Sequence, residues 1–84
     1  MKQQTYISKF VNKKGVLVTF ERWSDKKLST VKGKLIRLYK AWYDVFKKDI
    51  ANSEYIIIYE TKDNTQEKEV DRISIKDFKK LLEV

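Results

Sequence analysis

The sequence predicts a single, mainly β domain of the α+β class with one helix inserted around residues 41–51. The 84-residue chain is long enough for one hydrophobic core and too short for two. Three segments, 5–11, 16–23 and 54–61, are rich in β-branched and aromatic residues, which is the composition of strands. Two further strands are predicted at 30–38 and 69–75, and one stretch has apolar residues at helical spacing. The chain has no cysteine, so packing rather than disulfides must stabilise the fold.

Segments 5–11 and 16–23 predict an antiparallel hairpin. The loop between them, residues 12–15, ends in Gly15, and glycine suits a turn residue with left-handed backbone angles. In the second strand Val16, Val18 and Phe20 share one face with Arg22. We expect this face, rather than the one that carries Trp23, to point into the core.

The middle of the chain is ambiguous between strand and helix. A third strand is predicted to start at Thr30 and to run through Gly33 toward Leu38. The apolar residues from Leu35 to Ile50 also fall at helical spacing. We therefore place a helix at 41–51 and leave its start open, as early as Lys34.

The second half contains the strongest strand signal, at 54–61. Three consecutive isoleucines flanked by tyrosines indicate that both faces of this strand are covered. A polar turn at 62–68 precedes a further strand at 69–75. For the remaining segment two alternatives stay open: a helix opened by a Ser74/Asp77 capping box, or a 3₁₀ turn at 76–78 followed by a strand at 79–84.

Segments 31–35, 55–59 and 72–78 resemble strands of small SH3-like and Sm-like barrels, which bend their second strand at a glycine. The spacing is also similar to that of the YolD-like proteins of Firmicutes. The resemblance implies a five-stranded barrel with a helix inserted at 41–51, although such barrels normally join their second and third strands tightly. The alternative fold is two β-hairpins packed on one long helix, 34–51. The uridine-binding residues of Sm-like proteins have no counterpart here, so no site is transferred.

Catalysis is not expected from this composition. Histidine and cysteine are absent, which removes the commonest general base and the commonest nucleophile, and two glycines cannot build a phosphate loop. A carboxylate cluster could in principle hold Mg²⁺, but its alternating charges are more typical of a solvated hairpin tip. We therefore expect no enzyme, cofactor or metal. The cluster consists of Asp63, Glu67, Glu69 and Asp71.

The charge distribution favours an acidic partner. The formal net charge is +7, and residues 1–48 contain thirteen Lys/Arg against three Asp/Glu. Sixteen lysines against three arginines support attraction to phosphates rather than reading of bases. We favour nucleic acid as the partner, bound with little sequence specificity, with Trp23 stacking on an unpaired base. The candidate residues are Lys13, Lys14, Arg22, Trp23, Lys26, Lys27, Lys32 and Lys34.

The alternative partner is an acidic protein. Short, lysine-rich chains without proline are typical of inhibitors and accessory factors that phages and plasmids encode. Trp42 and Phe46 are expected to face the core of this domain, which leaves Tyr43 as the free aromatic residue of the cationic helix. The candidate residues for this interaction are Lys40, Tyr43, Lys47 and Lys48.

The sequence also bears on location and assembly. The first residues have no apolar core of a signal peptide, and no apolar run is long enough to span a membrane, so a cytoplasmic location is expected. The apolar strand at 55–59 would be prone to association if it lay at a sheet edge. It is therefore expected either to be central or to form a homo-oligomer contact.

Overall fold

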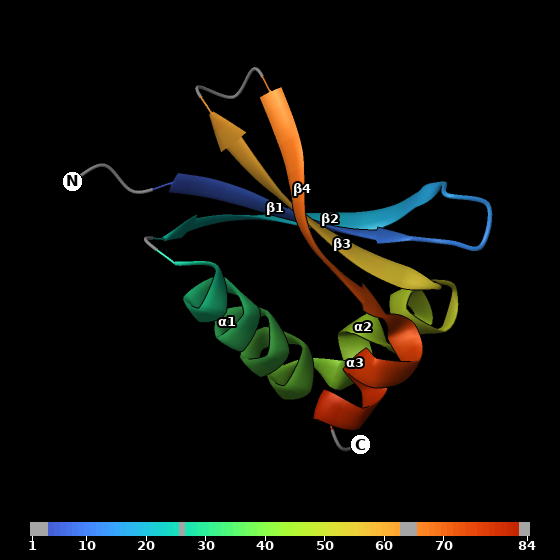
Figure 1. Cartoon of the computed structure of the whole chain (residues 1–84). Helices are drawn as coiled ribbons and strands as arrows, with labels where there is room; N and C mark the ends of the chain where they lie inside the picture. Colours follow the sequence, from blue (N-terminus) through green and yellow to red (C-terminus); the bar gives the residue numbers. More distant parts are fainter. Residues whose placement is uncertain (1–3, 26, 63–65, 83–84) are drawn as a thin grey trace.

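A computed structural model describes residues 4–25, 27–62 and 66–82. Within these residues the chain forms four strands and three helices (Figure 1). In chain order they are β1 (Gln4–Val11), β2 (Leu17–Asp25), α1 (Leu28–Ala41), α2 (Tyr43–Ala51), β3 (Tyr55–Lys62), β4 (Gln66–Ser74) and α3 (Ile75–Leu82).

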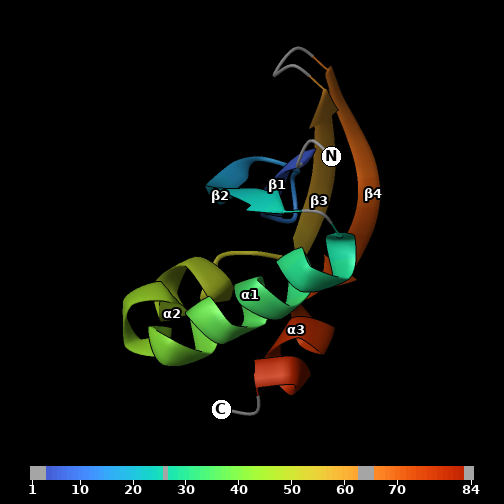
Figure 2. The same ribbon diagram turned by 90° about the vertical axis from the view of Figure 1, so that its left-hand side faces the viewer.

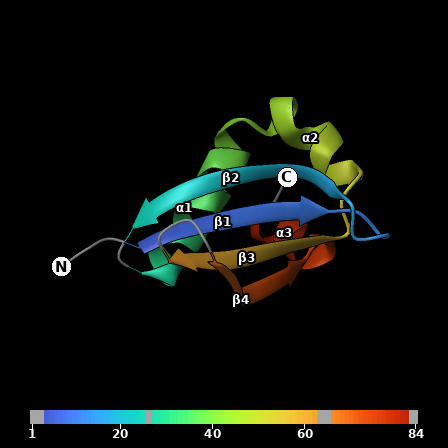
Figure 3. The same cartoon turned by 90° about the horizontal axis from the view of Figure 1, so that it is seen from above.

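The strands form one antiparallel sheet in the order β2-β1-β3-β4. All three helices lie on the same side of this sheet, and the other face is open (Figures 1 and 2). Seen from above, β2 and β4 form opposite edges of the sheet (Figure 3). The predicted five-stranded barrel is therefore wrong, because the edge strands do not pair with each other to close it.

The expected third strand is instead the helix α1. Its buried residues are Val31, Leu35 and Tyr39, which are four residues apart and occupy one face of a helix. A strand would need residues two apart on one face, and Gly33 between Val31 and Leu35 offers no side chain to bury. As a helix, the segment packs Val31, Leu35 and Tyr39 into core clusters with residues of the sheet.

The helical region is broken at Trp42. The backbone of Trp42 leaves the helical range at φ −115° and ψ 34°, and α2 begins at the next residue. Phe46 of α2 stacks on Tyr39 of α1, with ring centroids 4.2 Å apart. In an uninterrupted helix these residues would be about 10 Å apart along the axis, so the break permits the contact. The alternative of one helix at 34–51 is thus also wrong.

The first hairpin forms as predicted, and Gly15 has a left-handed φ of 81°. The inward face of β2 was predicted wrongly, however. A register shift between Phe10 and Val11 makes Val18 an extra residue, so Val18 and Trp23 pack on the core while Phe20 and Arg22 are exposed. The sheet face turned away from the helices, called the open sheet face below, carries alternate residues of each strand, including Thr5, Ile7, Lys9 and Val11 of β1 with their register partners.

An aromatic cluster joins the sheet to the helices. The ring of Phe10 stacks on Tyr39 at 4.8 Å and meets Phe78 of α3 edge-on at 5.7 Å. Phe78 is placed by α3, whose start shows the N-cap half of the predicted capping box: the backbone N–H of Asp77 donates to the Ser74 hydroxyl at 3.2 Å. Helix, rather than a 3₁₀ turn and strand, is therefore the correct alternative for this segment.

Candidate functional site

The two lysines of the hairpin turn lie far from the rest of the predicted basic site. Lys13 and Lys14 are exposed in a turn organised by Asn12, whose Oδ1 accepts hydrogen bonds from the N–H groups of Lys14 and Val16, both at 2.9 Å. This turn is at one end of β2, whereas Lys27 follows the other end (Figure 1). The nine residues of β2 separate them by about 30 Å.

The predicted stacking residue Trp23 is turned toward the helices. Its indole N–H donates to the hydroxyl of Ser8, which is fully buried, at 3.0 Å. Arg22 points the opposite way, to the open sheet face, because successive strand residues alternate between faces. Trp23 and Arg22 thus lie on opposite faces of the sheet rather than on one common surface. Lys26, which completes this part of the predicted site, lies outside the described residues.

The remaining two predicted residues form ion pairs within the domain. Lys32 pairs with Asp71 of β4 at 2.7 Å, and Lys34 pairs with Asp25 of β2 at 2.6 Å. Because they lie on a helix rather than a strand, these lysines point to opposite edges of the sheet and tie α1 to both. The predicted set as a whole is dispersed by the fold.

The helical layer provides a different cationic surface. Segments 27–51 and 75–82 contain ten Lys/Arg and three Asp/Glu, whereas the four strands contain five Lys/Arg and six Asp/Glu. The charge is therefore divided by layer rather than by sequence half. Eight of the ten cations are exposed and pair with no acidic group among the described residues; we call them the cationic helical surface. They are Lys27, Arg37, Lys40, Lys47, Lys48, Lys76, Lys79 and Lys80.

Three of the four residues expected to bind a protein belong to this surface, but the free aromatic residue is not the expected one. Tyr43 and Phe46 are partly buried against the core. Trp42, at the junction of α1 and α2, is 59% exposed, and Val45 beside it is 65% exposed. The sequence pattern missed Trp42 because its exposure depends on the break between the two helices.

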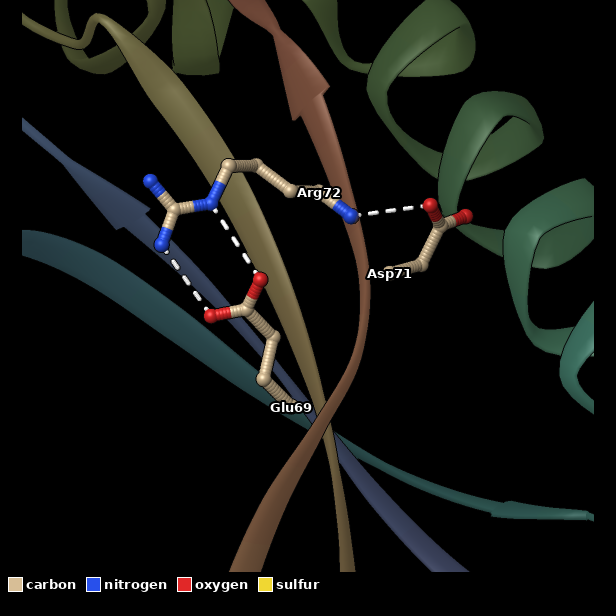
Figure 4. A network of polar contacts seen from close by, with 3 residues as sticks. All are labelled: Glu69, Asp71 and Arg72. Carbon is tan, nitrogen blue, oxygen red and sulfur yellow. Dashed lines mark hydrogen bonds and ion pairs between the residues drawn. The ribbon is translucent and has the colours of Figure 1, made fainter.

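The predicted carboxylate cluster is used in ion pairs. Glu67 pairs with Lys9 at 2.6 Å, and Glu69 holds Arg72 through two hydrogen bonds of 3.0 and 3.3 Å (Figure 4). Burial disfavours the charged form of Asp71, but hydrogen bonds from Lys32 and from the Arg72 N–H outweigh it and lower the pKa of Asp71. Asp63 lies outside the described residues, and within them no group of three or more acidic side chains could hold a metal ion.

The apolar strand predicted at 55–59 lies within β3, between β1 and β4. Both backbone edges of β3 are hydrogen-bonded, so it cannot pair edge to edge with another chain. No helix within the described ranges is long and apolar enough to cross a bilayer.

Fold and surface together define a two-layer α+β domain with a cationic helical side and an open sheet face. No protein family, curated protein or solved structure matches this chain. The comparisons therefore neither support nor contradict the resemblance to YolD-like proteins.

Proposed function

We propose that this chain is a cytoplasmic, non-catalytic protein that binds nucleic acid with little sequence specificity through its cationic helical surface. The observation that carries the proposal is the separation of charge by layer. Eight cations that form no ion pair with another described residue come from the three helices and from Lys27, the residue before α1. The three helices lie on one side of the molecule (Figure 2). A polyanion is the partner whose charge such an extended surface complements.

The chemistry of the surface supports backbone contacts rather than base reading. Seven of its eight cations are lysines, which attract phosphates as point charges and do not make the bidentate contacts of arginine. Each phosphate that a cation neutralises contributes about −0.9 to the slope of log K against log salt for duplex DNA. If all eight cations contacted phosphates, the slope would be about −7. We expect a shallower slope, because only some of them contact phosphates at one time.

The test is an anisotropy titration of fluorescein-labelled single- and double-stranded oligonucleotides at several salt concentrations. We expect binding at low salt that weakens steeply as salt is added. Reversing two charges on the central helix, Arg37→Glu with Lys40→Glu, should weaken binding about tenfold for every sequence and reduce the salt slope by about 2. Helix α1 is chosen because it contacts both α2 and α3.

The matched control is Lys13→Glu with Lys14→Glu at the hairpin tip. It changes the net charge by the same amount and also replaces two exposed cationic residues. We expect it to weaken binding much less. Equal losses in both variants would mean that net charge rather than the helical surface attracts the oligonucleotide, and flat titrations at low salt would reject nucleic acid altogether.

A second candidate function is favoured by the exposure of Trp42 and Val45 beside Lys40, Lys47 and Lys48. An exposed tryptophan in a lysine-rich segment is the composition of a hot spot for an acidic protein. If Trp42→Ala leaves the oligonucleotide titration unchanged, the aromatic patch is not part of a nucleic-acid site, and this second function gains support.

A further inference from the structure

The open sheet face carries an apolar patch at the end nearest the β1–β2 turn. The strand registers place Leu17, Val11 and Tyr55 in one row across the sheet, with Phe20 in the next row. Leu17 and Phe20 are each 47% exposed, and Tyr55 is 38% exposed. They account for three of the seven exposed large hydrophobic residues in the described part of the chain. A group of this kind on one face indicates an interaction surface.

The charges on this face argue against nucleic acid as its partner. Of its three cations, Lys9 is paired with Glu67, and Arg72 is paired with Glu69. Only Arg22 forms no ion pair with another described residue. Two carboxylates beside three cations leave little attraction for phosphates, so a protein surface of mixed charge fits the face better.

The charges are also placed so that the face complements itself. One row across the sheet runs from Arg22 on β2 through Ile7 and Tyr59 to Glu69 on β4. The neighbouring row runs from Phe20 on β2 to Arg72 on β4. Each row therefore has chemically complementary residues at its two ends, on the two edge strands of the sheet.

We propose that the open sheet face binds the same face of a second copy of this chain, about a twofold axis parallel to the strands. Such an axis places β2 of one copy over β4 of the other. Arg22 then faces Glu69 of the second copy, and the reverse contact forms by symmetry. Phe20 faces Arg72 of the second copy, whose guanidinium already lies 5.5 Å from the Tyr55 ring centroid and would be enclosed between two aromatic rings.

The size of the face sets the expected strength of the dimer. Four strands spaced about 4.8 Å apart, each contributing about seven residues of 3.3 Å, give a face of roughly 440 Å². Two such faces bury close to the ~1,000 Å² that marks the lower limit of specific interfaces. We therefore expect a monomer–dimer equilibrium in the micromolar range rather than a permanent dimer.

The first test is sedimentation equilibrium of the full chain without nucleic acid, over a wide range of micromolar concentrations. We expect a reversible dimer that Phe20→Glu abolishes, with circular dichroism confirming that the variant is folded. The control is Val45→Glu, which places the same charge on an even more exposed residue of the helical side and should leave the dimer intact. A wild type that stays monomeric, or equal effects of both variants, would overturn the proposal.

The second test addresses the twofold arrangement itself. Arg22→Glu and Glu69→Arg should each weaken the dimer by about tenfold, because each places like charges opposite one another at two symmetric positions. The double variant exchanges the charges and should restore association to within about threefold of wild type. Failure of the double variant to restore the dimer would exclude this arrangement. Because no nucleic acid is present, neither result depends on the proposed function.

Discussion

The hydroxyl of Tyr39 is buried without a hydrogen-bond partner among the described residues. The ring itself is well placed, stacked between Phe10 and Phe46 with Phe78 against its edge. The hydroxyl thus loses its contact with water and gains no protein partner in return, which costs free energy of folding. The aromatic ring of Tyr39 therefore stabilises the core, whereas its hydroxyl oxygen destabilises it.

We therefore expect Tyr39→Phe to increase the free energy of unfolding by about 1 kcal/mol, since it keeps the ring and removes the unpaired hydroxyl. Urea unfolding measures the change. The control is Tyr43→Phe, which removes a hydroxyl from a partly buried ring and should alter stability by less than about 0.5 kcal/mol. A destabilised Tyr39→Phe variant would show that the hydroxyl has a partner in solution.

The same substitution should change the pH dependence of stability. Burial raises the pKa of Tyr39 far above its usual value, and the nearby carboxylates of Glu21 and Asp49 raise it further. The unfolded chain loses this proton near pH 10 while the folded chain keeps it, so Tyr39 lowers stability as the pH rises above about 10. The advantage of Tyr39→Phe over wild type should therefore be larger at about pH 11 than at about pH 8.

Among the single elements, α1 contains a glycine, Gly33, that the packing of the helix does not require. It is exposed on the outer side of the helix, and an added Cβ would have no atom within 4 Å. Glycine inside a helix costs about 0.5–1 kcal/mol relative to alanine because it loses more backbone entropy. No contact among the described residues requires glycine at this position.

Gly33→Ala should accordingly raise the free energy of unfolding by about 0.5–1 kcal/mol, measured by thermal or urea unfolding. Gly15→Ala is the contrasting variant, because φ at Gly15 is +81° and an L-residue is strained there. That variant should be destabilised. If Gly33→Ala were instead destabilising, residue 33 would not lie on an open helix face.

The element that sequence could not assign was the segment that forms α1. Val31, Gly33 and Leu35 alternate as a strand would, while Val31, Leu35 and Tyr39 repeat as a helix does. Both patterns are present, and tertiary contacts with the sheet decide between them. The strands of the two hairpins were predictable because their β-branched runs end at clear turn residues. Because residues 30–38 were predicted as a strand and form a helix, the predicted barrel was also wrong.

The candidate site was predictable in kind but not in position. An excess of lysine in the first half was evident from the sequence, yet its division between helical and sheet layers depends on the fold. Lys32 and Lys34 form ion pairs because α1 brings them to Asp71 of β4 and Asp25 of β2. The sequence alone does not show that these elements lie next to α1. The exposure of Trp42 followed from a helix break that no proline or glycine marks.

For the whole molecule, the two surfaces lie on opposite sides of the sheet. The helices lie on one side of the sheet (Figure 2) and carry the cations, and the open sheet face on the other side carries the apolar patch. A dimer formed through the open sheet faces would place the two helical layers outward, facing in opposite directions. If both proposals hold, one dimer can bind two separate segments of nucleic acid.

This arrangement predicts that the protein bridges nucleic acids. Two duplexes labelled with donor and acceptor fluorophores should show energy transfer when wild type is added at low salt, and the signal should fall at high salt. Phe20→Glu should still bind each duplex in anisotropy, with at most a modest loss from its added negative charge, but give little energy transfer. Arg37→Glu with Lys40→Glu should weaken binding and transfer together, while the protein remains a dimer in sedimentation. Transfer that persists with Phe20→Glu would show that a single copy joins the duplexes, so that bridging would not require the open sheet face.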